Sequence, residues 1–165
     1  MRYFGLVASC AALAIGVSAC APKQPKRDVT AFDRTIQEDC YTVDLFTPAV
    51  IETPKSNVPQ PWQQFAGHWG GGAWDGEWCH DLYILSVGAG GEVDLIEAHA
   101  PHAGWGKVAT AFRRKATLTA DSRLRLFYKG VRVEYWLENG RLYGARFEAG
   151  TERRVTLSRR SKVGA

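Results

Sequence analysis

Side chains that could bind a metal ion are concentrated in the middle of this 165-residue chain. Its four histidines lie there with acidic residues among them: His68, Asp75, Glu77, His80, Asp81, His99 and His102. Imidazole and carboxylate bind transition metals, so His99 and His102 form a candidate metal site, with His80 or Asp81 as third donor. Pro101 lies between the two histidines and disfavours a helix that would carry both of them. The preferred alternative is polar residues at strand ends and in loops, and we predict neither a metal nor a cofactor.

The same acidic residues could also carry out glycoside chemistry. Asp75, Glu77 and Asp81 would supply the pair of carboxyl groups that such hydrolysis requires. Acidic residues in a Gly-rich segment are also typical of turns, and this second interpretation is preferred. The chain has no G-x-S-x-G nucleophile motif. We therefore predict no catalytic residues and no enzymatic activity.

Aromatic side chains are the other group suited to binding. Five of the six tryptophans precede residue 106, several of them beside glycines. Such rings bind sugars or apolar ligands when they line a barrel mouth, and otherwise they form the core. Both interpretations stay open. The candidate ligand-binding residues are Trp69, Trp74, Trp78, Trp105, Tyr128, Tyr135 and Arg146. Inside a barrel Arg146 could contact an anionic headgroup, or it could pair with Glu148 at the rim.

The elements that must position these residues are clearest in the C-terminal part, where three tight turns separate segments of alternating polarity. The turns are Lys129-Gly130, Asn139-Gly140 and Ala149-Gly150. The strands between them are Arg123–Lys129, Val131–Glu138, Arg141–Glu148 and Glu152–Arg159. Counting outward from the first turn pairs Leu126 with Val133, and it places Arg125 opposite Glu134. A slip of one residue would move the apolar residues to the other face, so the agreement supports an antiparallel meander.

Earlier segments predict about four more strands. They are Phe65–Trp74, Asp81–Val87, Glu92–His99 and a bent segment over Lys107–Thr119 that forms one long strand or two short ones. Val29–Asp39 could hold one or two helical turns, and residues 47–62 are expected to be extended coil. The predicted fold class is all-β, with an up-and-down antiparallel meander of about eight strands closing into a small barrel. A sandwich is the alternative.

Gly67-His68-Trp69 opens the first of these strands and resembles the G-x-W signature of the calycins, the superfamily of lipocalins, fatty-acid-binding proteins and avidins. Together with the meander, the resemblance covers Phe65–Arg160. It implies a lipocalin-like barrel in which Trp69 plugs one end and an arginine of the last strand, Arg154 or Arg159, packs across it. The second Trp-x-Gly, at Trp74–Gly76, lies outside that pattern, and a shared fold does not fix function.

The first twenty residues, MRYFGLVASCAALAIGVSAC, resemble the signal peptide of a bacterial lipoprotein. Arg2 gives a positive start, and the apolar run that follows is short for a membrane span. Val-Ser-Ala-Cys resembles a lipobox, which implies cleavage before Cys20 and lipidation of that residue. An ordinary secretory signal peptide is the alternative. In a Gram-negative bacterium Ala21 would direct the protein to the outer membrane, with its domain in the periplasm.

Two cysteines remain once Cys10 leaves with the signal peptide and Cys20 carries lipid. In an oxidising compartment Cys40 and Cys79 are expected to form a disulfide, and two unpaired buried thiols are the alternative. The predicted organisation is a signal peptide over residues 1–19, a lipidated Pro-rich tether and extended arm over 20–61, a barrel over 62–160 and a tail over 161–165.

Charge and localisation narrow the classes of partner. The chain has a formal net charge of +4, and its C-terminal half is rich in arginine and lysine. Spread along alternating strands, these are typical of a solvated sheet face, so no nucleic-acid partner is predicted. One candidate function of the membrane-anchored protein is binding of a small apolar or amphipathic ligand in the barrel. The other is a filled barrel that binds an envelope protein or a glycan through Trp/Gly-rich loops, as an inhibitor or assembly factor.

Overall fold

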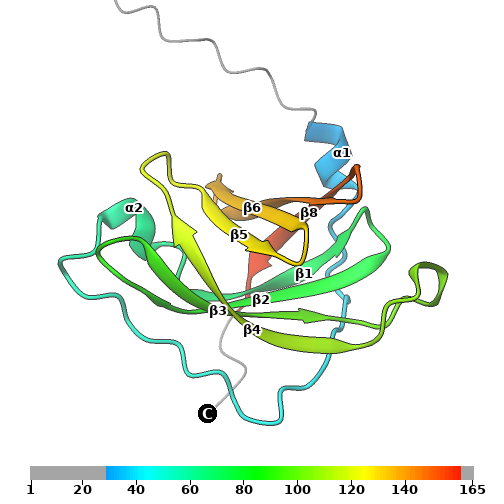
Figure 1. Cartoon of the computed structure of the whole chain (residues 1–165), viewed down its shortest axis with the longest axis horizontal. Coiled ribbons are helices and arrows are strands. Elements are labelled where there is room, and N and C mark those ends of the chain that lie inside the picture. The colour runs from blue at the N-terminus through cyan, green and yellow to red at the C-terminus, as the bar shows by residue number, and fades with distance from the viewer. Residues whose placement is uncertain (1–28, 161–165) are drawn as a thin grey trace, which may run out of the picture.

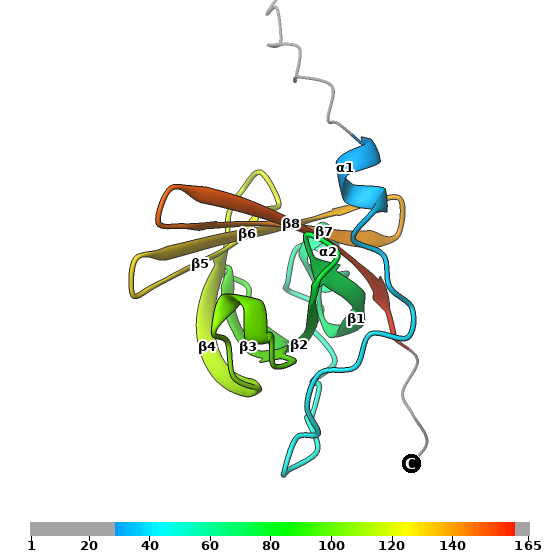
Figure 2. The same cartoon turned by 90° about the vertical axis from the view of Figure 1, so that its right-hand side faces the viewer.

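The computed structural model describes residues 29–160, which form a closed barrel of eight antiparallel strands (Figure 1 and Figure 2). The strands are β1 (Gly67–Trp74), β2 (Trp78–Val87), β3 (Glu92–His99), β4 (Thr110–Leu118), β5 (Leu124–Tyr128), β6 (Val131–Glu138), β7 (Arg141–Glu148) and β8 (Thr151–Arg159). Each pairs with its neighbour in the chain, and β8 pairs with β1. The predicted all-β meander is confirmed. The predicted signal peptide, Cys20 and the predicted tail lie outside the described residues.

The C-terminal hairpins form in the predicted register. Leu126 lies opposite Val133, and Arg125 lies opposite Glu134 with its Nε 3.5 Å from the carboxylate. Each of the three predicted turns has a non-glycine residue and then a glycine, both at positive φ. This is the backbone conformation of the type I′ turn, which suits the right-handed twist of paired strands.

The N-terminal half of the barrel differs from prediction at its strand ends. β2 begins at Trp78 rather than Asp81, because Trp74 pairs with Trp78 across a short turn. The segment expected to give one strand or two gives β4 alone. Two short helices precede the barrel, α1 (Val29–Asp33) and α2 (Gln60–Gln63), and a 3-10 turn, η1 (Ala103–Trp105), lies between β3 and β4.

One end of the barrel is closed by the segment that enters β1. Trp69 is buried, and its indole Nε1 donates a hydrogen bond to the carbonyl oxygen of Phe65 at 2.8 Å. The guanidinium of Arg159 lies over the Trp69 ring and donates to the carbonyl oxygens of Gln64 and Ala66. Of the two arginines considered from sequence, Arg159 therefore packs across the tryptophan.

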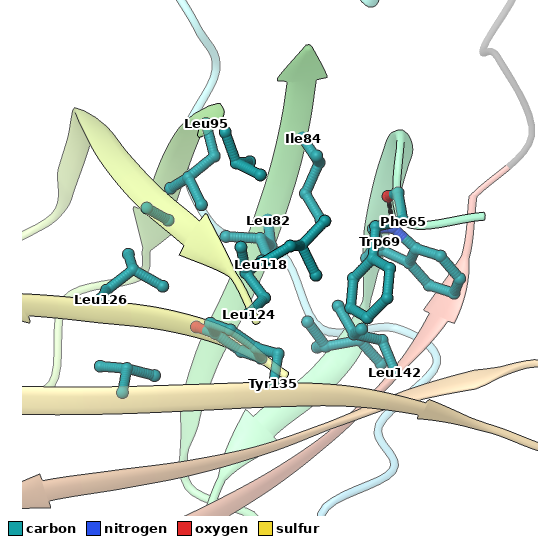
Figure 3. Packing of buried hydrophobic residues seen from close by; sticks show 14 of the residues in the cluster. Phe65, Trp69, Leu82, Ile84, Leu95, Leu118, Leu124, Leu126, Tyr135 and Leu142 are labelled. Carbon is teal, nitrogen blue, oxygen red and sulfur yellow. Dashed lines mark hydrogen bonds between the residues drawn. The ribbon is translucent and has the colours of Figure 1, made fainter. Parts of the chain in front are cut away.

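Inward side chains of the strands form an apolar core next to this closed end. Figure 3 shows leucines from several strands, together with Ile84 and Trp69, pointing into the space between the sheet walls. The fully buried leucines are Leu82, Leu95, Leu118, Leu124, Leu126, Leu142 and Leu157. The predicted shared interior of the C-terminal strands, sealed at its foot by Trp69, is thus present and is filled by side chains in this half of the barrel.

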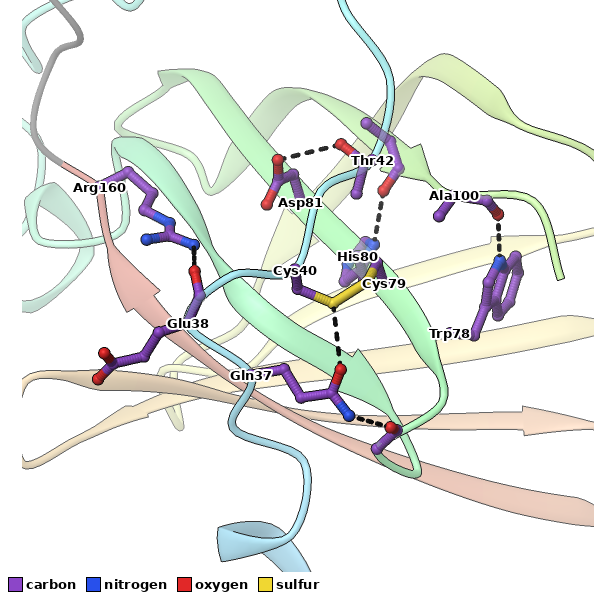
Figure 4. The surroundings of a disulfide bond; sticks show 12 residues. Gln37, Glu38, Cys40, Thr42, Trp78, Cys79, His80, Asp81, Ala100 and Arg160 are labelled. Atoms are coloured by element: carbon purple, nitrogen blue, oxygen red, sulfur yellow. Dashed lines mark hydrogen bonds between the residues drawn. A yellow bond between two sulfur atoms is a disulfide. The ribbon is translucent and has the colours of Figure 1, made fainter.

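The chain before the barrel packs along the outside of the barrel wall. Phe32 in α1 meets the ring of Trp136 edge-on at 5.7 Å between centroids. The predicted disulfide between Cys40 and Cys79 joins this arm to β2 (Figure 4). Nearby, the Thr42 hydroxyl donates to the Asp81 carboxylate at 3.0 Å (Figure 4). Between Phe32 and Thr42, therefore, the arm is attached to the barrel.

Candidate functional site

The end of the barrel opposite α2 has a polar interior. Alternate residues of a strand face the same side, so the inward rows that carry leucine near α2 carry ionisable side chains here. The buried or half-buried inward residues at this end are His80, Glu97, His99, Arg114, Tyr128, Tyr135 and Arg146. They come from β2, β3, β4, β5, β6 and β7, and we call them the polar cluster.

A column of stacked rings runs through the polar cluster. Trp78 stacks on His99 with 4.3 Å between ring centroids, and His99 stacks on His80 at 4.6 Å. His80 Nδ1 lies 3.2 Å from the carbonyl oxygen of Ala98, and its Nε2 lies 2.8 Å from Tyr135 Oη. Because a carbonyl only accepts, Nδ1 of the neutral ring carries the proton, and Nε2 accepts from the tyrosine hydroxyl.

Burial keeps these rings uncharged at neutral pH. Removal from water lowers the pKa of His80 to about 4 and lowers the pKa of His99 well below its ordinary value. Burial also raises the pKa of Tyr135 well above its ordinary value. His99 is only 4% exposed, yet its Nε2 has no hydrogen-bond partner. The column therefore contains a buried polar atom that is left unsatisfied.

Glu97 brings a negative charge into the interior, where it is 0% exposed. Its Oε2 accepts a hydrogen bond from Arg114 Nε at 2.7 Å, and its Oε1 lies 3.4 Å from Tyr135 Oη. The Arg114 guanidinium also stacks over the Tyr128 ring at 3.5 Å. Among the described residues β4 and β5 pair at only two positions. The Arg114–Tyr128 stack therefore links these strands where their backbones do not pair.

Arg146 occupies the interior between two aromatic residues and is only 5% exposed. Its Nη1 donates to Tyr128 Oη at 2.7 Å, and its guanidinium lies 5.5 Å from the Trp78 ring centroid. Its Nη2 also lies 3.1 Å from the Glu148 carboxylate, which pairs with Lys107 at 3.3 Å. Arg146 thus faces inward, and the pairing with Glu148 that was considered from sequence is present.

The β3–β4 loop, residues 100–109, lies over the polar cluster. Trp78 Nε1 donates to the carbonyl oxygen of Ala100 at 2.7 Å (Figure 4), and Trp105 meets the Trp78 ring edge-on. The guanidinium of Arg153 packs on the other ring, 3.7 Å from the centroid of Trp105. The Lys107–Glu148 ion pair adds a fourth connection. The loop is therefore held by a few contacts at one end of the barrel.

The structure separates the residues selected from sequence into two groups. Six candidate ligand-binding residues gather at the polar end: Trp74, Trp78, Trp105, Tyr128, Tyr135 and Arg146. Trp69 lies at the closed end. His102 lies in loop 100–109, where its Nε2 is 3.7 Å from Glu77, and Asp81 contacts the arm. The metal set considered from sequence is thus divided, and only His80 and His99 meet inside the barrel.

Glu97 and Arg114 belong to this site but were not selected from sequence. A usable signal existed for Glu97, because it is two residues from His99 on a predicted strand and must share its face. The hairpin then places His80 directly opposite His99, as the structure shows. Arg114 has a weaker signal, its alternation with the inward residues Ala116 and Leu118.

Comparison of the chain with protein-family models, with curated proteins and with solved structures found no match. Within residues 29–160, none of the helices has the length and apolar character needed to cross a bilayer. The function proposed below is therefore argued from the residues and their geometry.

Proposed function

We propose that this chain is a lipid-anchored envelope protein whose barrel binds a small amphipathic ligand with an anionic group. The ligand enters the polar end, beneath loop 100–109. The observation that carries the proposal is the burial of the Arg146 guanidinium between Trp78 and Tyr128. A buried guanidinium forms charge-assisted hydrogen bonds to an anionic group, which here would replace the Glu148 carboxylate, and neighbouring rings accept the apolar part of the same ligand.

The packed core sets the size of the ligand. The inward side chains below the polar cluster, including Leu82 and Leu126, are fully buried. A long acyl chain along the barrel axis would have to displace them, and each displaced leucine costs roughly 1.5–3 kcal/mol of burial. A short chain or a single ring system would need only the space beneath loop 100–109 that becomes available if the loop moves outward. Divergence of β4 from β5 supports entry at the same end.

A fluorescent amphipathic anion tests ligand binding directly. We expect 1-anilinonaphthalene-8-sulfonate to bind the folded chain, and we expect short fatty acids to displace it. The variant Arg146→Gln should bind the dye about 10-fold more weakly, because a charge-assisted hydrogen bond contributes about 1.5 kcal/mol or more. Arg132→Gln is the matched control, since Arg132 also packs on a ring but lies on the exposed face of β6. Equal binding by both variants would contradict the proposal.

The membrane anchor rests on the lipobox and has its own test. We expect radiolabelled palmitate to be incorporated into the chain in a bacterial host and the chain to fractionate with outer membranes. Cys20→Ser should lose the label, whereas Cys10→Ser, a change within the predicted signal peptide, should keep it. Absence of label from the wild-type chain would show an ordinary secretory signal peptide, and wild-type labelling of Cys20→Ser would show that Cys20 is not the lipidated residue.

The filled half of the barrel supports a second candidate, an envelope module that binds a partner protein or a glycan. Trp74 and Trp78 are buried, so contact would not use these two rings directly. Phe112 and Phe127 are 49% and 70% exposed and lie in the parts of β4 and β5 that do not pair with each other. Pull-down from envelope extract with Phe127→Ser and with Arg146→Gln separates the candidates. Loss of a partner only in Phe127→Ser would favour the module.

A further inference from the structure

Two histidines and a carboxylate meet at the centre of the polar cluster, separate from the Arg146 side that the proposed ligand uses. One possible ligand atom each from His80, Glu97 and His99 lies within 4.8 Å of the others, and all three residues are buried. We propose that these three residues bind a divalent transition-metal ion of the zinc class. Two imidazoles and one carboxylate are a donor set that zinc accepts, with further coordination positions left open.

The strongest indication is the buried His99 Nε2 that lacks a hydrogen-bond partner. An unsatisfied buried polar atom costs about 1–3 kcal/mol, and ligation of a metal ion would offset that cost. Stacking fixes the His99 ring between Trp78 and His80, which prevents it from turning out to solvent. A metal ion would satisfy this nitrogen.

The His80 ring is held in the tautomer that a metal ion requires. The Ala98 carbonyl oxygen accepts from Nδ1, which leaves the Nε2 lone pair directed at Tyr135 Oη. Backbone carbonyls commonly orient metal-binding histidines in this way through the nitrogen that does not bind the ion. On metal binding, the Tyr135 hydroxyl would give up its bond to Nε2 and keep its contact with Glu97.

Glu97 is oriented by Arg114, which engages only one of its two oxygens. Ligating carboxylates are usually held by such an outer hydrogen bond. The positive charge of Arg114 also reduces the attraction of the site for a cation, so we expect lower affinity than in a site with two carboxylates. Donor atoms in a tetrahedral zinc site are about 3.3 Å apart, given bonds of about 2.0 Å. The donor atoms must therefore close by up to about 1.5 Å, and the stacked His80 and His99 rings must turn so that a nitrogen of each points at the ion.

The direct experiment measures metal content and coordination in the purified full chain, expressed without a histidine tag. After chelator treatment and dialysis against Zn²⁺, we expect about one ion per chain by mass spectrometry. Titration with Co²⁺ should give a visible absorption band, and titration with Cu²⁺ should quench tryptophan fluorescence because Trp78 stacks on His99. Bound metal below about one tenth of an equivalent would overturn the proposal.

Variants place the ion among the histidines. His99→Ala should lose the bound metal, and His102→Ala is the matched control because His102 lies in the covering loop beside Glu77. If His99→Ala does not fold, nuclear magnetic resonance of the wild-type imidazoles answers the same question. Zn²⁺ should then shift the His80 and His99 ring signals and leave those of His68 and His102 in place. Metal retained by folded His99→Ala, or ring shifts confined to His68 and His102, would refute the site.

This experiment is independent of the ligand proposed above. Arg146→Gln should keep its metal while losing affinity for the dye, since Arg146 is bonded to Tyr128 and Glu148 rather than to the three donors. Loss of metal binding in His99→Ala without loss of dye binding would show that the dye does not require the metal ion. Failure of one proposal can thus be recognised without failure of the other.

Discussion

Arg159 on the last strand lies directly over Trp69 on the first, with its guanidinium 4.3 Å from the indole centroid. The same guanidinium donates to the carbonyl oxygens of Gln64 and Ala66, just before β1 begins. Gly67 makes this approach possible, because a Cβ there would collide with the arginine. One side chain therefore ties β8, β1 and the entering segment together at the closed end.

Replacing Arg159 should loosen this end of the barrel. Arg159→Ala removes a cation–π contact and two hydrogen bonds, so we expect the free energy of unfolding in urea to fall by about 1–2 kcal/mol. Arg154→Ala is the matched control, since Arg154 is also on β8 and also packs near a ring, that of Phe32. A smaller loss in Arg159→Ala than in Arg154→Ala would show that the Trp69 contact does not close the barrel.

The sequence predicts the C-terminal half of the fold well, for a local reason. Two-residue turns fix register, and register fixes which side chains face inward, so pairs such as Leu126 and Val133 follow from counting. The N-terminal half has longer connections, and there the prediction missed the start of β2 at Trp78. The strand register could not be derived by counting from a two-residue turn there, because three residues separate Trp74 from Trp78.

Sequence predicted the polar cluster only in part. Tyr128, Tyr135 and Arg146 follow from the C-terminal register, since they alternate with apolar inward residues. Closure of the barrel, however, brings β2 and β3 against β6, and this contact between distant strands joins His80 to Tyr135. Spacing within one segment favoured His99 with His102, whereas pairing across the hairpin places His99 with His80.

The disulfide should stabilise the arm more than the barrel. Cys40 and Cys79 are 39 residues apart, and the chain-entropy relation gives about 4 kcal/mol for a loop of that length. We expect the double variant Cys40→Ser, Cys79→Ser to unfold at lower urea concentration, with about 2–4 kcal/mol less stability. Because the strand pairing does not involve Cys40, its far-ultraviolet circular dichroism should match wild type below the transition.

Hydrogen exchange provides the check on where that stability is lost. Amides of the arm, such as Gln37, which donates to the Gly71 carbonyl oxygen, should exchange faster in the double variant. Amides of the β6–β7 hairpin should be accelerated less, and at most by the loss in global unfolding free energy. Equal acceleration in both regions would mean that the bridge stabilises the barrel as a whole.

Acid should destabilise the metal-free protein before its carboxylates titrate. His80 and His99 have lowered pKa values in the folded state, about 4 for His80, whereas unfolded histidine titrates near 6.5. Between these values the unfolded chain binds more protons, so the free energy of unfolding falls as pH decreases. Each histidine contributes a slope approaching about 1.4 kcal/mol per pH unit.

Urea unfolding at a series of pH values, in the presence of chelator, measures this slope. Over the range from about 6.5 to about 5, few carboxylates change protonation, so the histidines dominate. The variant His80→Gln, His99→Gln should show a nearly flat profile in that range if it folds. A flat profile in the wild-type chain would mean that the histidines are accessible to protons in the folded state.

Replacing Arg114 should lower the free energy of unfolding more than replacing Glu97, its partner in a buried ion pair. Glu97 is fully buried, whereas 23% of the Arg114 side chain is exposed where β4 and β5 diverge. Arg114→Met leaves a buried carboxylate without its partner and should cost about 3–5 kcal/mol. Glu97→Gln leaves an arginine that can reach water, so we expect a clearly smaller loss.

In a double-mutant cycle, Glu97→Gln added to Arg114→Met should restore much of the stability, because the buried charge is gone. A larger loss from Glu97→Gln than from Arg114→Met would mean that Arg114, rather than Glu97, is the buried charge that needs its partner.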